Sequence, residues 1–262
     1  MRFFDTHAHL NDEDFAGILD DVVAEAVAAG VKRTLVIGID RASSERAVEI
    51  AWRHESLYAA VGIQPNVCGP ATEEDWNAIV AMLDRPKVVA LGETGLDGYW
   101  QTVPMEVQRV WFDRHLRLSQ ERRIPFIVHL RDSVEPIREM LEEAARRGPL
   151  RGVMHSFTGD EAYAARCVEL GLYVSFAGMA TFKKSDDLRR VAASVPEDRL
   201  LVETDAPYLS PEPYRGKKPN RPAWVVHTLA KLADARGVSP ESLAETTYRN
   251  ACRLFGLDAD AA

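Results

Sequence analysis

Eight short apolar runs recur along this chain of 262 residues, and stretches with helical periodicity separate them. Most of the runs are rich in Val, Ile, Leu and Phe and lack clean alternation, which is typical of parallel strands buried on both faces. We expect strands at residues 2–5, 34–39, 57–63, 87–92, 125–130, 152–155, 172–176 and 200–204. The spacing of apolar residues predicts helices at 16–29, 43–54, 73–83, 105–122, 134–147, 160–170, 186–194, 223–237 and 240–255.

This alternation of strands and helices over about 250 residues predicts an α/β fold, a single (β/α)₈ TIM barrel, rather than a doubly wound open sheet. No break in composition suggests a linker. We therefore place one domain at 1–258 and a short tail at 259–262, with disorder expected only in the final DADAA. In such a barrel the active site lies at the C-terminal ends of the strands.

The composition, 46% apolar and 27% charged, is that of an ordinary globular protein. No apolar run approaches the roughly 18 residues that span a bilayer, and the first residues lack the apolar core of a secretion signal. We therefore expect a cytoplasmic protein with no membrane partner. Cys68, Cys167 and Cys252 are too far apart for a CxxC pair, and a net charge of −8 argues against a protein that coats nucleic acid without specificity.

Two of the seven histidines, His7 and His9, follow the first expected strand in the sequence FFDTHAHL. Residues i and i+2 of an extended chain point to the same face, so both imidazoles can reach one metal ion. The alternative is a coincidence in which one histidine caps the strand and the other packs in the core. The pair by itself leaves both interpretations open.

Four more side chains that can bind metal stand at the ends of other expected strands: Glu93, His129, His155 and Asp205. Each has an ordinary explanation by itself, such as a salt bridge for Glu93, a hydrogen-bonded core position for His129 or a helix cap for Asp205. An ionisable group at the end of an apolar strand is costly to bury unless it is paired or bound to metal. Six such groups at the ends of five strands favour a metal site.

Imidazoles and carboxylates without thiolate favour Zn²⁺, Mn²⁺ or Mg²⁺ over softer metals. Six ligands exceed the three or four protein ligands of one catalytic zinc ion, so a two-metal site with a bridging carboxylate fits better. The remaining histidines, His54, His115 and His227, fall in or at the ends of expected helices, where we interpret them as structural. The chain has no P-loop, GxGxxG, GxSxG or HExxH motif.

Motifs along nearly the whole chain carry a family resemblance. They are DTHAHL at 5–10, GIQP at 62–65, GETGLD at 92–97, PFIVHLRDS at 125–133, MHSFTG at 154–159, SFAGMATFK at 175–183, LVETDAPYL at 201–209, RGKKPNRP at 215–222 and NACRLF at 250–255. With these motifs the chain resembles the TatD family of metal-dependent deoxyribonucleases, within the amidohydrolase-type metal barrels. The resemblance implies two divalent metal ions, Mg²⁺, Mn²⁺ or Zn²⁺.

The resemblance also assigns a role to each of the six groups. It implies one ion bound by His7, His9 and Asp205, another bound by His129 and His155, and Glu93 as the bridge between them. Asp205 would in addition accept a proton from the attacking water, a role suited to a carboxylate beside the nucleophile. Asp205 and Glu93 are therefore the expected catalytic carboxylates.

Two positions depart from the family pattern. Members usually read GIHP where this chain has Gln64, whose amide can donate a hydrogen bond to a phosphate but cannot carry a charge. Rate or substrate preference can differ for that reason. Ser156 stands where the family more often has Cys, and we expect that change to be mild. Both residues are candidates for substrate contacts.

Cations near the expected metal site are further candidates, since a phosphodiester needs positive charge close by. Arg131 follows the fifth expected strand, and Lys183 and Arg215 lie in the segments after the seventh and eighth. The alternatives are a salt bridge from Arg131 to Asp132 and a solvated basic loop at 215–221.

We expect a 3′–5′ exonuclease that acts on single-stranded or frayed DNA ends, as a monomer or weak oligomer with a role in DNA repair. A two-metal site beside cations suits phosphodiester hydrolysis, and Tyr99, Trp100 and Phe182 can stack on bases unless they pack in the core. One alternative is an ester or amide hydrolase, such as an aminoacyl-tRNA deacylase or a small-molecule amidohydrolase, although no lysine ends the fourth strand. Another is a non-catalytic protein that binds nucleic acid or metal, which the complete ligand set disfavours.

Overall fold

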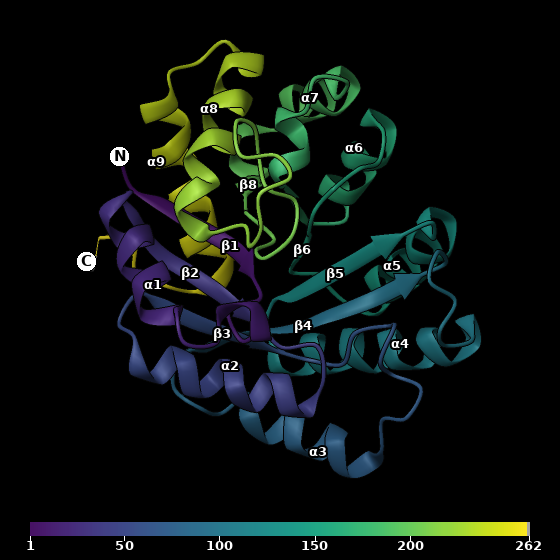
Figure 1. The fold of residues 1–262 in the computed structure, drawn as a ribbon. Coiled ribbons are helices and arrows are strands. Elements are labelled where there is room, and N and C mark those ends of the chain that lie inside the picture. The colour runs from purple at the N-terminus through teal and green to yellow at the C-terminus, as the bar shows by residue number, and fades with distance from the viewer. Residues whose placement is uncertain (261–262) are drawn as a thin grey trace.

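Eight parallel strands form a nearly closed barrel in the computed structural model of the chain, which describes residues 1–260 (Figure 1). Each strand pairs with the next one in the sequence, from β1 to β8. The strands are β1 (Phe3–Ala8), β2 (Val31–Ile37), β3 (Leu57–Val61), β4 (Val88–Asp97), β5 (Phe126–Arg131), β6 (Gly152–Met154), β7 (Tyr173–Phe176) and β8 (Leu200–Val202). The predicted TIM barrel is confirmed.

Helices surround the barrel, with one after each of the strands β1 to β7 and two after β8 (Figure 1). They are α1 (Leu19–Ala28), α2 (Arg41–Arg53), α3 (Glu73–Met82), α4 (Met105–Arg122), α5 (Val134–Arg147), α6 (Glu161–Glu169), α7 (Asp186–Ser194), α8 (Val225–Arg236) and α9 (Pro240–Phe255). The helices α4, α5, α7 and α9 have the predicted bounds, and the others end within three residues of them. None of the described helices combines the length and apolar character needed to cross a membrane.

Side chains and glycines at the helix ends explain several of these boundaries. The carboxylate of Asp40 accepts a hydrogen bond from the backbone N–H of Ser43 at 2.8 Å, in a capping box that begins α2. Helices α8 and α9 end at Gly237 and Gly256, whose φ angles of 67° and 69° lie in the left-handed region that favours glycine.

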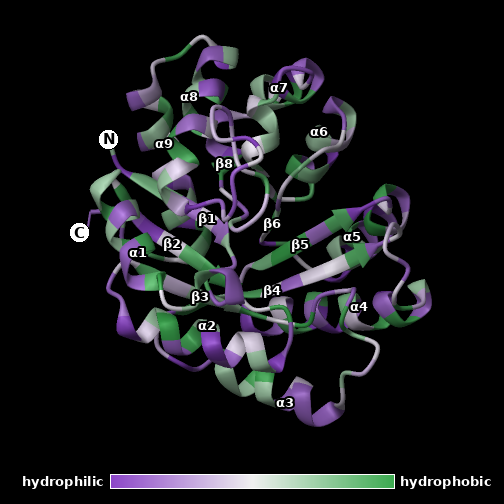
Figure 2. Cartoon of the chain, viewed as in Figure 1, coloured by the Kyte–Doolittle hydropathy of each residue, from purple (hydrophilic) through white to green (hydrophobic). Residues whose placement is uncertain are grey.

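The interior of the barrel is apolar, and α9 fills its N-terminal end. The buried cluster there contains one residue or more from every strand, joined by residues of α9: Phe4, Leu35, Ala60, Ala90, Ile127, Val153, Tyr173, Leu201, Tyr248, Ala251, Cys252 and Phe255. Figure 2 shows hydrophobic stretches on the strands and a mixture of hydrophobic and hydrophilic residues on the surrounding helices. Because this end is filled by apolar side chains, the polar residues at the strand ends meet at the opposite, C-terminal end.

Strand β4 departs most from its predicted bounds, because it continues to Asp97 instead of ending at residue 92. Gly92 and Gly95 interrupt the apolar pattern, so the sequence signal ends early. Gly95 pairs with His129 of β5 at a φ of 138°, and a Cβ there would lie only 2.1 Å from the carbonyl oxygen of His129. The glycine allows β4 and β5 to stay paired up to the polar mouth of the barrel. The other strand ends lie within three residues of the predicted ones.

The beginning of the expected tail packs against the barrel. Arg33 donates a hydrogen bond to the carbonyl oxygen of Asp258 at 2.7 Å, and Arg2 donates one to that of Ala259 at 2.5 Å. The expectation of disorder from residue 258 onward is therefore wrong for these two residues. The last two residues of the expected tail, 261 and 262, lie outside the described part of the chain.

Candidate active site

The closure of the barrel between its first and last strands brings three of the predicted ligands together. The backbone N–H of Asp205 donates to the carbonyl oxygen of His7 at 2.8 Å, and that of His9 donates to Ala206 at 2.6 Å. Strand β1 continues to Ala8, so His7 lies inside it rather than after it. The Nε2 atoms of His7 and His9 lie 3.2 Å apart, and each lies 3.6 Å from Oδ1 of Asp205. Nitrogen ligands at about 2.0–2.1 Å from one zinc-like ion are roughly 3–3.5 Å apart, so these distances suit a shared cation.

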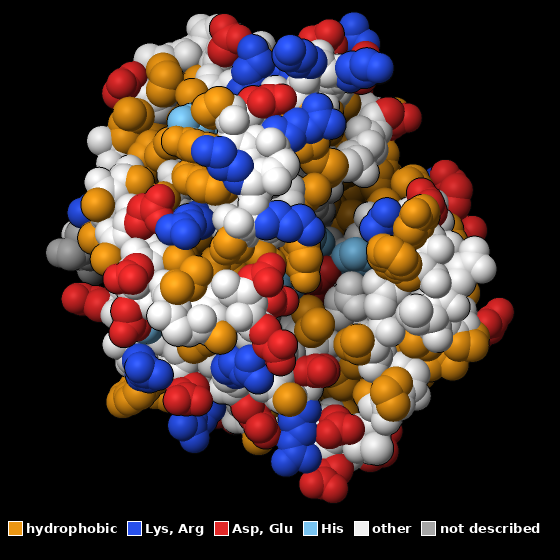
Figure 3. All heavy atoms as spheres, in the orientation of Figure 1, with side chains coloured by type: hydrophobic (Ala, Val, Ile, Leu, Met, Phe, Trp, Pro, Cys, Tyr) orange, Lys and Arg blue, Asp and Glu red, His pale blue; other side chains and the backbone are white. Residues whose placement is uncertain are grey.

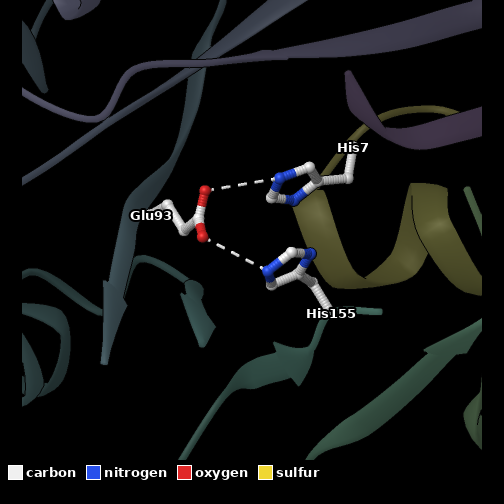
Figure 4. Close-up of side chains that lie close together, drawn as sticks. All are labelled: His7, Glu93 and His155. Atoms are coloured by element: carbon white, nitrogen blue, oxygen red, sulfur yellow. Dashed lines mark ion pairs between the residues drawn. The ribbon is translucent and has the colours of Figure 1, made fainter. Parts of the chain in front are cut away.

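The carboxylate of Glu93 lies at the centre of the site. Its Oε1 is 2.8 Å from Nδ1 of His129 and 3.2 Å from Nε2 of His155. Its Oε2 is 3.5 Å from Nε2 of His7 and 3.7 Å from that of His9. Figure 4 shows the two oxygens directed at the rings of His7 and His155, which stack with their centroids 3.9 Å apart. Glu93 therefore lies between two pairs of histidines, the position that the family resemblance implies for the bridging carboxylate.

Two triads have donor atoms that all lie within 4.8 Å of one another. They are His7, Glu93 and His155, and His7, His9 and Asp205. Of the described residues, His129 joins neither triad and contacts the site through Glu93, whereas the family resemblance pairs it with His155 on one ion. The donors are nitrogen and oxygen without sulfur, which is the chemistry that Zn²⁺, Mn²⁺ and Mg²⁺ prefer. The residues present thus fit divalent cations in donor type and in spacing.

Opposite charges balance within this buried cluster. Burial by itself raises the pKa of Glu93, but the charge of His155 and hydrogen bonds from the histidines outweigh it and hold the pKa well below its ordinary value. Burial opposes the charged form of His155, yet Glu93 and Glu203 raise its pKa well above the ordinary value. Burial and the charge of His155 lower the pKa of His7. At neutral pH Glu93 is therefore ionised and His7 is neutral, whereas His155 carries a proton that a bound cation would displace.

Two carboxylates behind the histidines escaped the sequence reasoning. Oδ2 of Asp97 lies 3.0 Å from Nε2 of His129, and Oε1 of Glu203 lies 3.3 Å from Nδ1 of His155. A carboxylate on the far side of a metal-binding imidazole fixes its orientation and raises its basicity. Both residues are acids that end an apolar run, in GETGLD and LVETD, and that signal could have identified them.

Sharp turns follow strands β6 and β8 at the mouth of the barrel. Ser156 and Asp205 have φ angles of 44° and 56°, in the left-handed region that non-glycine residues rarely adopt. Glu203 accepts a hydrogen bond from the backbone N–H of Ser156 at 2.6 Å, and Asp5 accepts from the N–H and Oγ1 of Thr204 at 2.8 and 2.5 Å. Burial raises the pKa of Asp5 to about 8, although the hydrogen bonds from Thr204 oppose the shift. These buried acids hold the two turns in place.

A cavity of about 930 Å³ lies above the cluster. Figure 3 shows histidine and acidic side chains beside a hollow on this face, with lysine and arginine side chains nearby. Of the residues predicted from the sequence, His9, Gln64, Glu93, His129, Arg131, His155, Ser156 and Asp205 line the cavity. Lys183 and Arg215 are exposed and lie outside the lining, so the structure does not bring these two cations to the metal cluster.

The predicted substrate contacts differ in how they are held. Oε1 of Gln64 accepts a hydrogen bond from the backbone N–H of Asn66 at 2.9 Å, so its amide nitrogen is the group that can face a substrate. The guanidinium of Arg131 lies 3.8 Å from the ring centroid of Tyr99. Arg131 therefore packs on this ring and does not form the salt bridge to Asp132 that the sequence left open as an alternative.

The three remaining histidines lie away from the cluster, in or at the ends of helices. His54 caps α2, and its Nε2 lies 3.3 Å from Oδ1 of Asp20. His227 of α8 packs edge-on against Tyr214 at a centroid distance of 5.2 Å. His115 of α4 is fully buried. These contacts agree with the structural interpretation.

Acid is expected to destabilise the fold partly through His115. Its Nε2 accepts a hydrogen bond from the backbone N–H of Ile63 at 3.1 Å, and burial lowers its pKa from 6.5 to about 4. Below about pH 6.5 His115 binds a proton in the unfolded chain but stays neutral in the folded chain. The stability of the fold therefore falls as the pH falls toward 4. At pH 5 the loss is about 2 kcal/mol relative to neutral pH.

Urea unfolding at pH 7.5 and pH 5.0 tests this expectation with His115→Gln, whose amide oxygen can still accept from Ile63. The wild type should lose more stability between the two pH values than the variant does. His54→Gln is the matched control and should behave as the wild type. An equal pH dependence in His115→Gln and the wild type would contradict the assignment.

The barrel and its converging imidazoles and carboxylates place the chain in the class of metal-dependent hydrolases. The family described as TatD related DNase matches residues 4–256. The chain belongs to this TatD family. The predicted family, fold and hydrolase class are thereby confirmed.

Individual relatives agree with this assignment. The chain is 38% identical over 255 residues to YabD of Bacillus subtilis (strain 168), an uncharacterized metal-dependent hydrolase, with 97% of this chain and 99% of that protein covered. A Citrobacter koseri protein named 3′–5′ ssDNA/RNA exonuclease TatD is 35% identical over 259 residues, with 97% of this chain and 99% of that protein covered. The crystal structure of YJJV, a TatD homologue from Escherichia coli K12, matches with a TM-score of 0.91 and 30% identity, over 98% of this chain and 99% of that chain.

Proposed function

We propose that this hydrolase removes nucleotides from the 3′ ends of single-stranded or frayed DNA. The observation that carries the proposal is the arrangement of four histidines around Glu93 at the base of a large cavity, with Asp205 beside them. The relative named 3′–5′ ssDNA/RNA exonuclease TatD supports a nucleic-acid substrate, and by the same name RNA is a second substrate to test.

We further propose that the site holds two divalent cations. His7, His9 and Asp205 would bind one, His129 and His155 the other, and Glu93 would contact both. When bound, such cations lower the pKa of water and offset the negative charge of the phosphodiester. The spacing of the donor atoms supports this assignment, because His7, Glu93 and His155, and likewise His7, His9 and Asp205, have donors within 4.8 Å of one another.

Asp205 is suited to accept the proton of the attacking water. Burial opposes its ionisation, but the hydrogen bond from His9 and the nearby histidine charges lower its pKa below the ordinary value. The carboxylate is therefore ionised at neutral pH, and it lines the cavity, where water and substrate meet. The amide of Gln64, the hydroxyl of Ser156 and the guanidinium of Arg131 line the same cavity and can donate hydrogen bonds to phosphate oxygens. Lys183 and Arg215 do not line this cavity, so we assign them to phosphates of the strand outside it.

We place this activity in the cytoplasm, in a monomer or weak oligomer that trims DNA ends during repair. The three cysteines are buried free thiols, which suits a reducing compartment.

Labelled oligonucleotides test the proposed activity. With Mg²⁺ or Mn²⁺, a 5′-labelled single strand should give a ladder of progressively shorter products, whereas a 3′-labelled strand should release labelled mononucleotide at once. EDTA should stop both reactions, and His7→Ala should reduce them by more than about 100-fold, because even residues behind metal ligands contribute about 10–100-fold. His54→Ala, a histidine outside the site, should retain activity. Turnover of aminoacyl-tRNA or ester substrates without cleavage of DNA or RNA under any metal condition would contradict the proposal.

A further inference from the structure

Two aromatic side chains beside the candidate active site are unusually exposed. Tyr99 and Trp100, in the loop between β4 and α4, have 51% and 58% of their surface exposed. Trp100 lines the cavity together with Glu93, His129 and His155. An exposed aromatic ring does not contribute its apolar surface to the core. At the edge of a cavity, such a ring points to a ligand that would cover it.

Both rings contact the guanidinium of Arg131, and Tyr99 lies closer to it than Trp100 does. The guanidinium carbon of Arg131 lies 3.8 Å from the ring centroid of Tyr99 and 5.3 Å from that of Trp100. Arg131 therefore covers a face of Tyr99. The ring of Trp100 stands at 87° to that of Tyr99, with the centroids 5.1 Å apart. Tyr99 and Arg131 thus both pack against Trp100, which lines the cavity.

A single buried carboxylate connects this aromatic pair to the metal cluster. Oδ1 of Asp97 accepts hydrogen bonds from the backbone N–H groups of Tyr99 and Trp100, both at 2.9 Å. Oδ2 of the same residue lies 3.0 Å from Nε2 of His129. The backbone N–H of Gly98 also donates to the carbonyl oxygen of Arg131 at 2.8 Å. These hydrogen bonds fix the loop that carries Tyr99 and Trp100 relative to His129.

We propose that Trp100 stacks on an unpaired base next to the scissile phosphate, with Tyr99 and Arg131 holding its ring in position. The inference rests on the proposed nuclease function and adds a base-binding subsite to it. A base at a single-stranded or frayed end exposes its π face, whereas a base inside a duplex is covered by its neighbours. The positive charge of Arg131 at the same edge of the cavity suits the phosphate that accompanies such a base. Such a subsite would favour single strands of any sequence over duplexes.

Binding measurements test the subsite separately from catalysis. The probe is a 5′-fluorescein single strand of thymidines with phosphorothioate linkages at its 3′ end, followed by fluorescence anisotropy. Trp100→Ala should weaken binding by about 5- to 150-fold, the range for the loss of one stacked base, and Trp100→Phe should retain most of the affinity. Trp52→Ala is the matched control, because Trp52 on α2 is 69% exposed and does not line the cavity. Its affinity should equal that of the wild type.

A second probe lacks the bases of its last two nucleotides but keeps the phosphates. The wild type should bind this abasic strand more weakly by the same factor, and Trp100→Ala should lose nothing further. Preference for the single strand over a blunt duplex should also fall in Trp100→Ala. Thermal unfolding shows that each variant is folded.

The outcomes separate the subsite from the proposed function. If the wild type binds and cleaves DNA while Trp100→Ala equals Trp52→Ala, the subsite is wrong and the nuclease function stands. An equal loss by Trp100→Ala on the base-bearing and abasic strands also overturns stacking. If the wild type neither binds nor cleaves nucleic acid, the nuclease function and the subsite are both wrong.

Discussion

Replacing Glu93 with glutamine is expected to lower kcat/KM for oligonucleotide hydrolysis by more than about 100-fold. Carboxylates behind metal-binding histidines already contribute about 10–100-fold in comparable sites, and Glu93 contacts the histidines directly. The amide keeps the size of the side chain but loses its charge. The amide also has only one acceptor oxygen. Glu93 has two, one facing His129 and His155 and the other facing His7 and His9.

The variant Glu93→Gln keeps the shape of the side chain but leaves the charged His155 without this partner, so we expect it to be less stable than the wild type, and thermal unfolding must show that it is folded before activities are compared. The matched control is Glu245→Gln on α9, which removes a carboxylate that pairs with Arg2 at 2.7 Å, outside the candidate site. Glu245 is 42% exposed, so its loss should cost less than about 1 kcal/mol and leave activity unchanged. Activity of Glu93→Gln within tenfold of the wild type would show that Glu93 is not central to the reaction.

The second large effect is expected from Gly95→Ala, which should destabilise the fold by roughly 2–6 kcal/mol. The residue has a φ of 138°, and a Cβ would lie 2.1 Å from the carbonyl oxygen of His129. Strained backbone costs about 1–3 kcal/mol, and overpacking adds about 1–3 kcal/mol. Because β4 and β5 carry Glu93 and His129, any relief of the overlap would separate these two ligands. Urea unfolding and activity should therefore fall together.

Gly17→Ala separates the two causes. Gly17 also has a positive φ, 78°, but an added Cβ would meet no atom within 4 Å. It should cost only about 1–2 kcal/mol, the penalty for a left-handed L-residue, and it should leave activity unchanged. Equal destabilisation by Gly95→Ala and Gly17→Ala would contradict the close approach of β4 and β5.

The strands and the residues that converge at the mouth of the barrel could be predicted because each gives a local signal. Parallel strands buried on both faces are short apolar runs, and His129, His155 and Asp205 stand out as polar residues at their ends. The C-terminal ends of the strands meet at one face of a TIM barrel, and this rule predicted that the polar residues would lie close together, as they do in the structure. The end of β4 was missed because Gly92 and Gly95 look like a strand end, although close pairing with β5 requires such residues.

Contacts that depend on loop conformation could not be predicted in this way. Lys183 and Arg215 lie in the segments after β7 and β8 as expected, but the loops carry them outside the cavity lining. The guanidinium of Arg215 instead lies 4.2 Å from the ring centroid of Phe182. The hydrogen bonds that the backbone N–H groups of Tyr99 and Trp100 donate to Asp97 likewise have no signature in the spacing of residues.

Counting bound metal tests the central claim, that the histidine and carboxylate cluster is a two-cation site, most directly. The purified chain is dialysed to equilibrium against Mn²⁺, and the bound metal is measured by elemental analysis. We predict two ions per chain for the wild type and for Glu245→Gln, and fewer than two for Glu93→Gln at the same free Mn²⁺. One ion or none in the wild type, or the same count in Glu93→Gln, would contradict the two-cation site.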